Sequence, residues 1–172
     1  MRAATDVIDI FLQPGEYYVG DADYRIRTLL GSCVSVTLWH PAKRVGAMSH
    51  FLLAERGAGP MLGIDGRYGE EAIWLMLRDL ARAKVDPTQC QAKIFGGGDM
   101  FQRKGRKDAP NIGKKNGEAA RSLLHALGIP IVSESLFGAG HRKVIFDVAS
   151  GDVWVRQVKP ADAGSPQASK SA

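Results

Sequence analysis

Cysteine and long apolar runs are scarce in this sequence, and each absence narrows the class of protein. Among 172 residues there are two cysteines, too few for the disulfide framework of a small secreted domain. No apolar run approaches the roughly 20 residues that a membrane-spanning helix needs. Residues 1–6 contain no apolar stretch that would begin a secretory signal. These absences predict a cytoplasmic protein without membrane insertion.

Basic residues are in modest excess, but their arrangement does not favour binding to nucleic acid. The net charge is +5, from 23 basic and 18 acidic residues, and the basic residues gather at 103–107, 114–115 and 142–143. No aromatic residues are interleaved with these clusters, so the sequence provides no platform on which bases could stack. Such clusters can attract an acidic protein surface. We therefore expect no nucleic-acid partner, and the role of the basic loop 103–107 stays open.

The sequence also lacks a recognisable cofactor loop or metal site. Gly96–Gly98 follows a predicted strand, but the Gly-Lys-Ser/Thr signature of a phosphate-binding loop is missing. A tight turn that lets the backbone approach a site explains the three glycines better. A zinc site needs three or four ligands, and neither His40 nor His125 is spaced to join Cys33 and His50. We expect no cofactor and no metal.

The pattern of apolar residues predicts one α+β domain over residues 1–159. Residues 1–10 are interpreted as a loose lead-in, and residues 160–172 as a disordered tail because they contain almost no large apolar side chain. Strands outnumber helices, so we expect two main helices that cover one face of a mixed sheet. The predicted elements are a hairpin over 29–51, a helix over 69–83, a strand over 92–95, a helix over 117–127 capped by Asn116, a strand over 129–132, and a hairpin of 143–148 with 153–158.

The first hairpin carries the most informative pair of residues. Both of its flanks alternate apolar with small or polar residues, and Pro41 suits a type I turn in the four-residue loop 40–43. If the turn centres between Pro41 and Ala42, Cys33 lies directly opposite His50. Opposed residues share a face of the sheet, with Cβ atoms about 4.5–5.5 Å apart. The opposite face, predicted to form the core, carries Val34, Val36, Leu38, Val45 and Ala47.

The pairing of Cys33 with His50 predicts nucleophilic catalysis. An imidazole can remove the thiol proton, and the thiolate then attacks an electrophilic carbon. A free cysteine is more often a small buried hydrophobe, which is how we interpret Cys90. Cys33 differs because a Gly-Ser step precedes it, where backbone N–H groups near Ser32 and Val34 could stabilise an oxyanion. Peptide hydrolysis, transamidation and ester hydrolysis are all compatible with such a site.

Six blocks of the sequence resemble one family in their order and spacing. The chain is similar over residues 10–158 to the chemoreceptor glutamine deamidase family, CheD. The blocks are Leu30-Gly31-Ser32-Cys33-Val34-Ser35-Val36, Gly46-Ala47-Met48-Ser49-His50-Phe51-Leu52-Leu53, Arg67-Tyr68-Gly69, Lys93-Ile94-Phe95-Gly96-Gly97-Gly98-Asp99-Met100, Ile112-Gly113-Lys114-Lys115-Asn116 and Arg142-Lys143-Val144-Ile145-Phe146.

The resemblance implies a layered α/β/β sandwich and a hydrolase that converts receptor glutamine side chains to glutamate with release of ammonia. It implies a thioester mechanism without metal or cofactor, in which Cys33 and His50 are the catalytic pair. Thr28 is the residue that best matches the family's supporting threonine, although its spacing to the cysteine differs by one residue from that of other members. The glycine-rich segment 137–142 also departs from the family pattern, because His141 precedes the arginine.

The resemblance further implies partners and a second activity. The partners are the cytoplasmic domains of chemotaxis receptors and, for some members, a CheC-type phosphatase. Methyl-ester hydrolysis at the same receptor sites is compatible with a thioester intermediate. The alternative from another class is a non-enzymatic adaptor, a basic domain that docks on an acidic receptor without modifying it. The sequence requires nothing larger than a monomer, and it does not identify the target glutamines.

Overall fold

The chain folds into two β-sheets and two α-helices. The computed structural model describes residues 6–59, 62–100, 111–158 and 169–171. In chain order the elements are β1 (Ile8–Phe11), β2 (Tyr17–Gly20), β3 (Tyr24–Leu30), β4 (Val34–His40), β5 (Val45–Ser49), α1 (Gly69–Arg82), the 3₁₀ helix η2 (Pro87–Gln89), β6 (Gln91–Gly96), α2 (Ile112–Ala126), β7 (Ile131–Leu136), β8 (His141–Asp147), β9 (Val153–Val158) and β10 (Ser169–Ser171).

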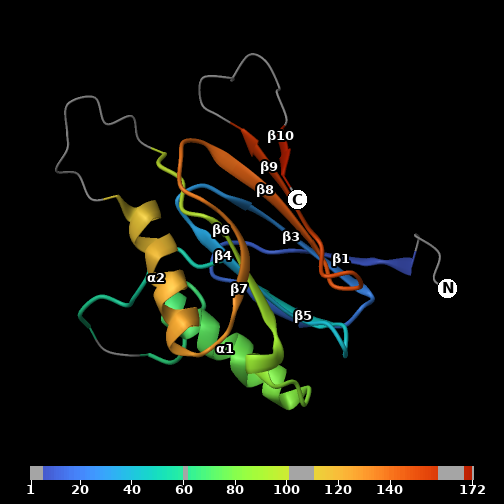
Figure 1. Cartoon of the computed structure of the whole chain (residues 1–172). Helices are drawn as coiled ribbons and strands as arrows, with labels where there is room; N and C mark the ends of the chain where they lie inside the picture. Colours follow the sequence, from blue (N-terminus) through green and yellow to red (C-terminus); the bar gives the residue numbers. More distant parts are fainter. Residues whose placement is uncertain (1–5, 60–61, 101–110, 159–168, 172) are drawn as a thin grey trace.

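The elements form three layers. One sheet has the strand order β2-β5-β4-β6-β7 and is called here the covered sheet, because both helices pack on it; the other, the outer sheet, has the order β1-β3-β8-β9-β10. Figure 1 shows the helices on one side, the covered sheet in the middle and the outer sheet beyond it. One apolar core lies between the helices and the covered sheet, and a second lies between the two sheets. The predicted α+β class and the α/β/β layering are confirmed.

Helix α1 follows the predicted pattern closely. Its buried residues include Ala72, Ile73, Met76 and Leu80, a spacing of three, four and seven that places them on one helical face. Glu70 and Glu71 occupy its first turn, where a carboxylate is stabilised by the positive end of the helix dipole. The prediction of a helix over 69–83 is therefore confirmed to within one residue at its end.

Helix α2 begins earlier than predicted, and the assignment of Asn116 as its cap is wrong. The helix starts at Ile112, and the side chain of Asn111 caps it by accepting a hydrogen bond from the backbone N–H of Lys114 at 2.9 Å. Asn116 lies inside the helix with 1% of its surface exposed. The helix ends as expected before Gly128, whose φ of +71° terminates it.

The two ends of the chain carry strands that the sequence did not indicate. β1 begins at Ile8 and pairs in parallel with β3, so the lead-in interpretation of residues 1–10 fails from that residue onward. β10 pairs antiparallel with β9, so the predicted disorder of the tail is wrong at Ser169–Ser171. The rest of that tail, 160–168 and 172, lies outside the described residues, as does the basic loop 103–107.

The first hairpin is present, but its register and its first strand differ from the prediction. The chain leaves the outer sheet after Leu30 and enters the covered sheet at Val34, so 29–39 is not one strand. β4 and β5 pair through Leu38 with Ala47, a shift of two residues from the predicted pairing. The loop keeps its predicted length of four residues but lies one residue later, at 41–44, where the Arg44 N–H donates to the His40 carbonyl oxygen at 2.9 Å and Arg44 adopts φ 51°. A shift of two residues leaves every side chain on its predicted face.

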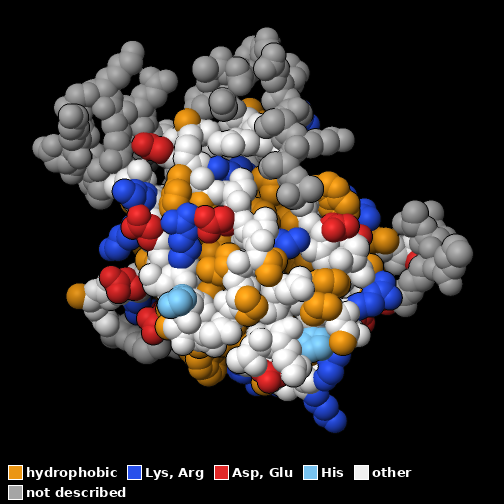
Figure 2. Space-filling view, in the orientation of Figure 1, with side chains coloured by type: hydrophobic (Ala, Val, Ile, Leu, Met, Phe, Trp, Pro, Cys, Tyr) orange, Lys and Arg blue, Asp and Glu red, His pale blue; other side chains and the backbone are white. Residues whose placement is uncertain are grey.

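Charges are mixed on the face of the molecule seen in Figure 2. Basic and acidic side chains alternate there, with apolar side chains between them, and no broad area carries a single sign. Two of the basic clusters lie within the described residues. In the one at 142–143 only Lys143 is exposed, because Arg142 is buried with 3% of its surface exposed. None of the helices in the described part of the chain is long and apolar enough to span a membrane.

Candidate active site

Cys33 occupies the crossing point between the two sheets. The connection of Gly31, Ser32 and Cys33 carries the chain from the end of β3 in the outer sheet to the start of β4 in the covered sheet. The thiol is half-buried and packs against the core between the sheets. This position at the open end of two strands leaves the sulfur accessible while the backbone around it is held on both sides.

Three fixed donors hold the carbonyl groups of this connection. Gly98 N–H donates to the Gly31 oxygen and Gly97 N–H to the Cys33 oxygen, each at 2.9 Å. Asn116 Nδ2 donates to the Ser32 oxygen at 3.0 Å. Because all three carbonyls are engaged, the orientation of each peptide plane around the cysteine is set by the glycine turn and by α2.

The same bonds leave the backbone N–H groups of Ser32 and Cys33 beside the thiol. A trans peptide directs its N–H away from its C=O, so the N–H groups of Ser32 and Cys33 point away from the donors that hold the carbonyls. Among the described residues the Ser32 N–H has no acceptor, whereas the Cys33 N–H is directed at the residue's own sulfur. The prediction that the Val34 N–H stabilises an oxyanion is wrong for this conformation, because that N–H donates to the Phe51 oxygen at 3.1 Å. The candidate oxyanion donors are therefore the N–H groups of Ser32 and Cys33.

Gly96 is required where the glycine turn touches this connection. A Cβ atom on Gly96 would lie 2.3 Å from the Cys33 carbonyl oxygen, and its φ of +108° belongs to a region that favours glycine. The interpretation of Gly96–Gly98 as a tight turn that brings backbone close to the site is thus confirmed. Arg142 fixes the turn from the other side by donating to the Gly96 oxygen at 3.2 Å.

His50 lies just past the end of β5 on the face that carries Cys33. The pairs Val34–Phe51 and Thr37–Met48 flank it, which places Ser35 directly opposite His50 and Cys33 one diagonal step away. Diagonal neighbours are separated by roughly 7–8 Å between Cα atoms. The prediction of direct opposition is therefore wrong by two residues, whereas the prediction that both side chains share one face is confirmed.

Thr28 contacts His50 from the other sheet. Its Oγ1 lies 2.6 Å from His50 Nδ1 and 2.9 Å from the Leu12 carbonyl oxygen. The carbonyl can only accept, so the threonine hydroxyl donates to Leu12 and accepts from a protonated Nδ1. The neutral ring then carries its lone pair on Nε2. That atom is buried and has no hydrogen-bond partner among the described residues.

Burial keeps both members of the pair uncharged. It lowers the pKa of His50 from 6.5 to about 4, with the nearby carboxylate of Glu16 acting weakly in the opposite direction. Burial also raises the pKa of the Cys33 thiol above its usual value of 9.0, and the residue's own backbone N–H partly offsets this. The resting site therefore holds a thiol and a neutral imidazole, and not a preformed thiolate–imidazolium ion pair.

The low pKa of His50 predicts a loss of stability in acid. The unfolded imidazole binds a proton near its ordinary pKa of 6.5 and the folded one only near 4, so the unfolded state gains protons first as the pH falls. The stability associated with the neutral, buried imidazole of His50 is fully present above pH 6.5. About 3 kcal/mol of unfolding free energy is lost by pH 4. Denaturant unfolding of wild type and of His50→Asn at several pH values checks this. An identical pH dependence in the two proteins would contradict it.

Two residues that hold the site were missed as such by sequence reasoning. Asn116 donates a second hydrogen bond, from the same Nδ2 to the Leu52 oxygen at 2.8 Å, so one amide joins the cysteine connection to the segment after His50. Arg142 reaches Gly96, Ser135 and Phe137 from a buried position. Helical spacing from Gly113 and strand alternation with Val144 could have indicated that these polar residues point inward.

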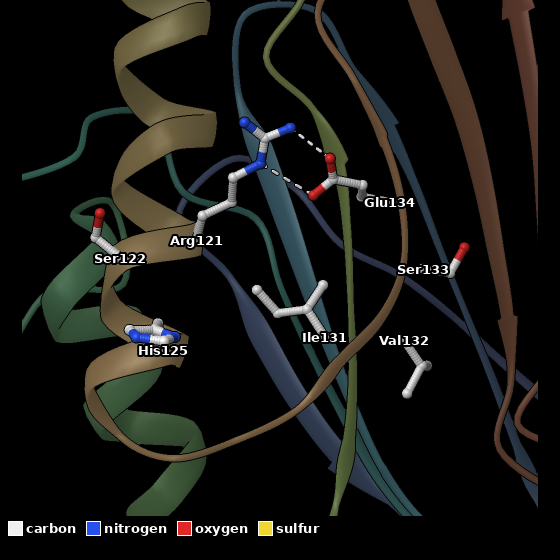
Figure 3. Close-up of a pocket in the computed structure, with 7 residues that line it drawn as sticks. All are labelled: Arg121, Ser122, His125, Ile131, Val132, Ser133 and Glu134. Atoms are coloured by element: carbon white, nitrogen blue, oxygen red, sulfur yellow. Dashed lines mark hydrogen bonds and ion pairs between the residues drawn. The ribbon is translucent and has the colours of Figure 1, made fainter.

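A groove on the helix side of the molecule lies away from this site. It has a volume of about 600 Å³ and runs between α2 and the edge strand β7. Figure 3 shows Arg121 on the helix reaching across to Glu134 on the strand, with His125 one turn further along the helix. His125 follows Asn116 by nine residues, about 13 Å along the helix axis. The charges of Arg121 and Glu134 at the centre of the groove neutralise each other, so neither residue is an activated group.

The second cysteine, Cys90, and the second buried histidine, His40, have structural surroundings. Cys90 is 1% exposed within the helix-side core, and burial raises the pKa of its thiol to about 11. His40 accepts from the Lys43 N–H through Nδ1 at 3.1 Å and contacts Gln89 through Nε2. No three His, Cys, Asp or Glu side chains of residues 6–59, 62–100, 111–158 and 169–171 are grouped to hold a metal ion.

Comparisons with known proteins converge on one family. A family model described as CheD chemotactic sensory transduction matches residues 52–157. A protein of Albidiferax ferrireducens named "Probable chemoreceptor glutamine deamidase CheD 2" is 63% identical over 154 residues, 89% of each chain. Similarly named proteins of Dechloromonas aromatica and Chromobacterium violaceum are 46% and 43% identical, over 94% and 89% of this chain and 94% and 79% of their own.

Proposed function

Since this chain belongs to the CheD family of chemotactic sensory transduction proteins, we propose that it hydrolyses glutamine side-chain amides in chemoreceptors, the activity that its relatives' names give them. The family match begins after His50, so the geometry must support the choice of residues. One observation carries that choice. The lone pair of a neutral imidazole, oriented by Thr28 through Nδ1, is unpartnered on the face that bears the Cys33 thiol.

We assign the acylation step to Cys33 and His50. The thiol rotates toward Nε2, which takes its proton as the sulfur attacks the carboxamide carbon of the substrate glutamine. The N–H groups of Ser32 and Cys33 stabilise the oxyanion that forms. Protonated His50 then donates to the departing nitrogen, ammonia leaves, and a thioester on Cys33 remains.

The second half of the reaction releases glutamate. Neutral His50 removes a proton from a water molecule, the water oxygen attacks the thioester carbon, and the carbon–sulfur bond breaks. The proton on the imidazole returns to the sulfur. Each half-reaction begins with a neutral imidazole, which burial of His50 maintains down to a pH of about 4.

Thr28 is proposed to position the imidazole, the function of the third residue in a catalytic triad. Replacing Thr28 with valine preserves shape but leaves the buried Nδ1–H without an acceptor. We expect kcat/KM to fall about 10- to 100-fold, mainly through kcat, with about 1–3 kcal/mol of lost stability. Steady-state kinetics of Thr28→Val and Thr28→Ser measure this. The serine variant retains the hydroxyl, so equal losses in both variants would remove Thr28 from the mechanism.

Incubation of the purified protein with a receptor cytoplasmic fragment tests the activity itself. Deamidation adds 1 Da at each modified glutamine and releases one ammonia, so peptide mass spectrometry and an ammonia assay report the same event. Binding without either signal would favour the alternative, a non-enzymatic adaptor that docks on the receptor. A fragment carrying glutamate methyl esters tests the second proposed activity, because the same thioester forms when methanol is the leaving group.

The remaining assignments are proposed together. The chain acts as a cytoplasmic monomer whose catalytic domain spans residues 1–159, and its substrates are the cytoplasmic domains of the receptors. A CheC-type phosphatase is a proposed regulatory partner. Size-exclusion chromatography with light scattering, alone and with a CheC-type protein added, distinguishes a monomer from a dimer and detects that complex.

A further inference from the structure

Two buried polar atoms near the thiol have no hydrogen-bond partner. They are Ser35 Oγ and His50 Nε2, two of the three such side-chain atoms among the described residues. Ser35 is completely buried and His50 is 2% exposed. A buried polar atom without a partner costs stability, so two in one place require an explanation.

The pairing of the strands brings these two atoms to the same side of the sheet. Ser35 lies opposite His50, between the pairs Val34–Phe51 and Thr37–Met48, and opposed side chains have Cβ atoms about 4.5–5.5 Å apart. Cys33 precedes Ser35 by two residues, so its side chain emerges on the same face. The hydroxyl, the free imidazole nitrogen and the sulfur therefore surround one small region between the sheets.

We propose that Ser35 Oγ and His50 Nε2 together hold the water molecule that hydrolyses the thioester. This inference rests on the proposed function. The water donates one O–H to Nε2 and the other to Ser35 Oγ, which satisfies both unpartnered atoms and leaves the water's lone pairs directed toward the acyl group on Cys33. Ser35 is thus a water-positioning residue of the second half-reaction.

The step is balanced with water as the only co-reactant. The water oxygen bonds to the acyl carbon while one water proton moves to Nε2. The carbon–sulfur bond then breaks, and the imidazolium proton passes to the sulfur. The products are a carboxylic acid, which ionises, and the free Cys33 thiol. Attack by the thiol in the first half-reaction needs Nε2 but not the serine hydroxyl, so loss of Ser35 should slow deacylation selectively.

Acetylation of Cys33 by p-nitrophenyl acetate tests this without depending on the natural substrate. In Ser35→Ala we expect the p-nitrophenol burst to keep its rate within about twofold, whereas the acetyl-enzyme, followed by intact mass spectrometry, should persist at least about tenfold longer than in wild type. Hydroxylamine, which attacks a thioester without a general base, should restore fast turnover. The melting temperature should not fall, because the hydroxyl that is removed has no partner among the described residues.

Ser49→Ala is the matched control. Ser49 is as buried as Ser35 and is adjacent to His50 in sequence, but its hydroxyl points to the other face and accepts the Val36 N–H at 3.3 Å. This variant should deacylate at the wild-type rate. The proposal is overturned if Ser35→Ala deacylates normally, if burst and deacylation slow in proportion, or if Ser49→Ala reproduces the defect. If wild type deamidates no receptor glutamine, the proposed function fails, yet the acetyl-enzyme comparison still decides the role of Ser35.

Discussion

Cys33→Ala is expected to abolish ammonia release from a receptor fragment, with a fall of at least about 10⁴-fold in kcat/KM. Removal of the sulfur leaves no group that can form the thioester, and the backbone N–H groups of residues 32 and 33 then stabilise only a slow direct attack by water. The alanine side chain fits the half-buried position without new contacts. Peptide mass spectrometry for the 1 Da gain and an ammonia assay measure the loss.

Cys90→Ala provides the matched control for the nucleophile. The substitution is identical in chemistry, but Cys90 lies in the core beside the helices and burial raises the pKa of its thiol to about 11. We expect about 1–2 kcal/mol of lost stability from the small cavity and unchanged activity. Activity retained in Cys33→Ala, or lost in Cys90→Ala at a temperature where the variant is folded, would show that the nucleophile has been misassigned.

His50→Asn is expected to lower kcat/KM by about 10³- to 10⁴-fold at neutral pH. An asparagine amide occupies nearly the position of Nδ1, so it can keep the contact with Thr28 Oγ1, but nothing replaces Nε2. The thiol must then ionise without assistance, and burial has already raised its pKa above 9.0. Steady-state kinetics over a range of pH values measure this effect.

The shape of the pH profile separates loss of the base from general damage. Without His50 the reactive thiolate exists only in proportion to the hydroxide concentration, so the rate of His50→Asn should rise about tenfold per pH unit below the thiol pKa. Wild type should stay nearly flat across the neutral range, because its base is unprotonated above a pH of about 4. A flat profile in the variant would mean that His50 is not the base.

Cys33 and His50 lie on the predicted common face of the sheet, although the predicted register was incorrect. The predicted turn placed the two residues directly opposite each other, whereas the loop lies one residue later, with the bond from Arg44 N–H to the His40 oxygen, and this displacement moves the pairing by two residues. Side chains alternate between faces with a period of two, so the error left both residues on one face. An error of one residue would have separated them.

Errors in local structure concealed the residues that support the site. Because the start of α2 was predicted at Asn116, this residue was interpreted as an exposed cap. Its amide is in fact buried and donates to both the Ser32 and Leu52 oxygens. The assumption of one strand over 29–39 hid the passage of the chain between sheets at Gly31. The strand break depends on a distant partner, the glycine turn that binds the cysteine connection. The helix start depends on a choice between two nearby asparagines, and the structure shows that Asn111 is the cap.

The sequence by itself determined which residues form strands and helices through most of the chain, which faces are apolar, and that a cysteine and a histidine share one face. Those properties follow from local periodicity, because the side-chain directions of a strand or helix depend only on neighbouring residues. The tertiary structure alone decided that Thr28 contacts His50 from another sheet, that the carbonyl groups around Cys33 are held by the glycine turn and by Asn116, and that, among the described residues, Ser35 Oγ and His50 Nε2 are both buried without a partner. Each of these depends on hydrogen bonds between segments far apart in the chain, and burial by both sheets sets the pKa of the base.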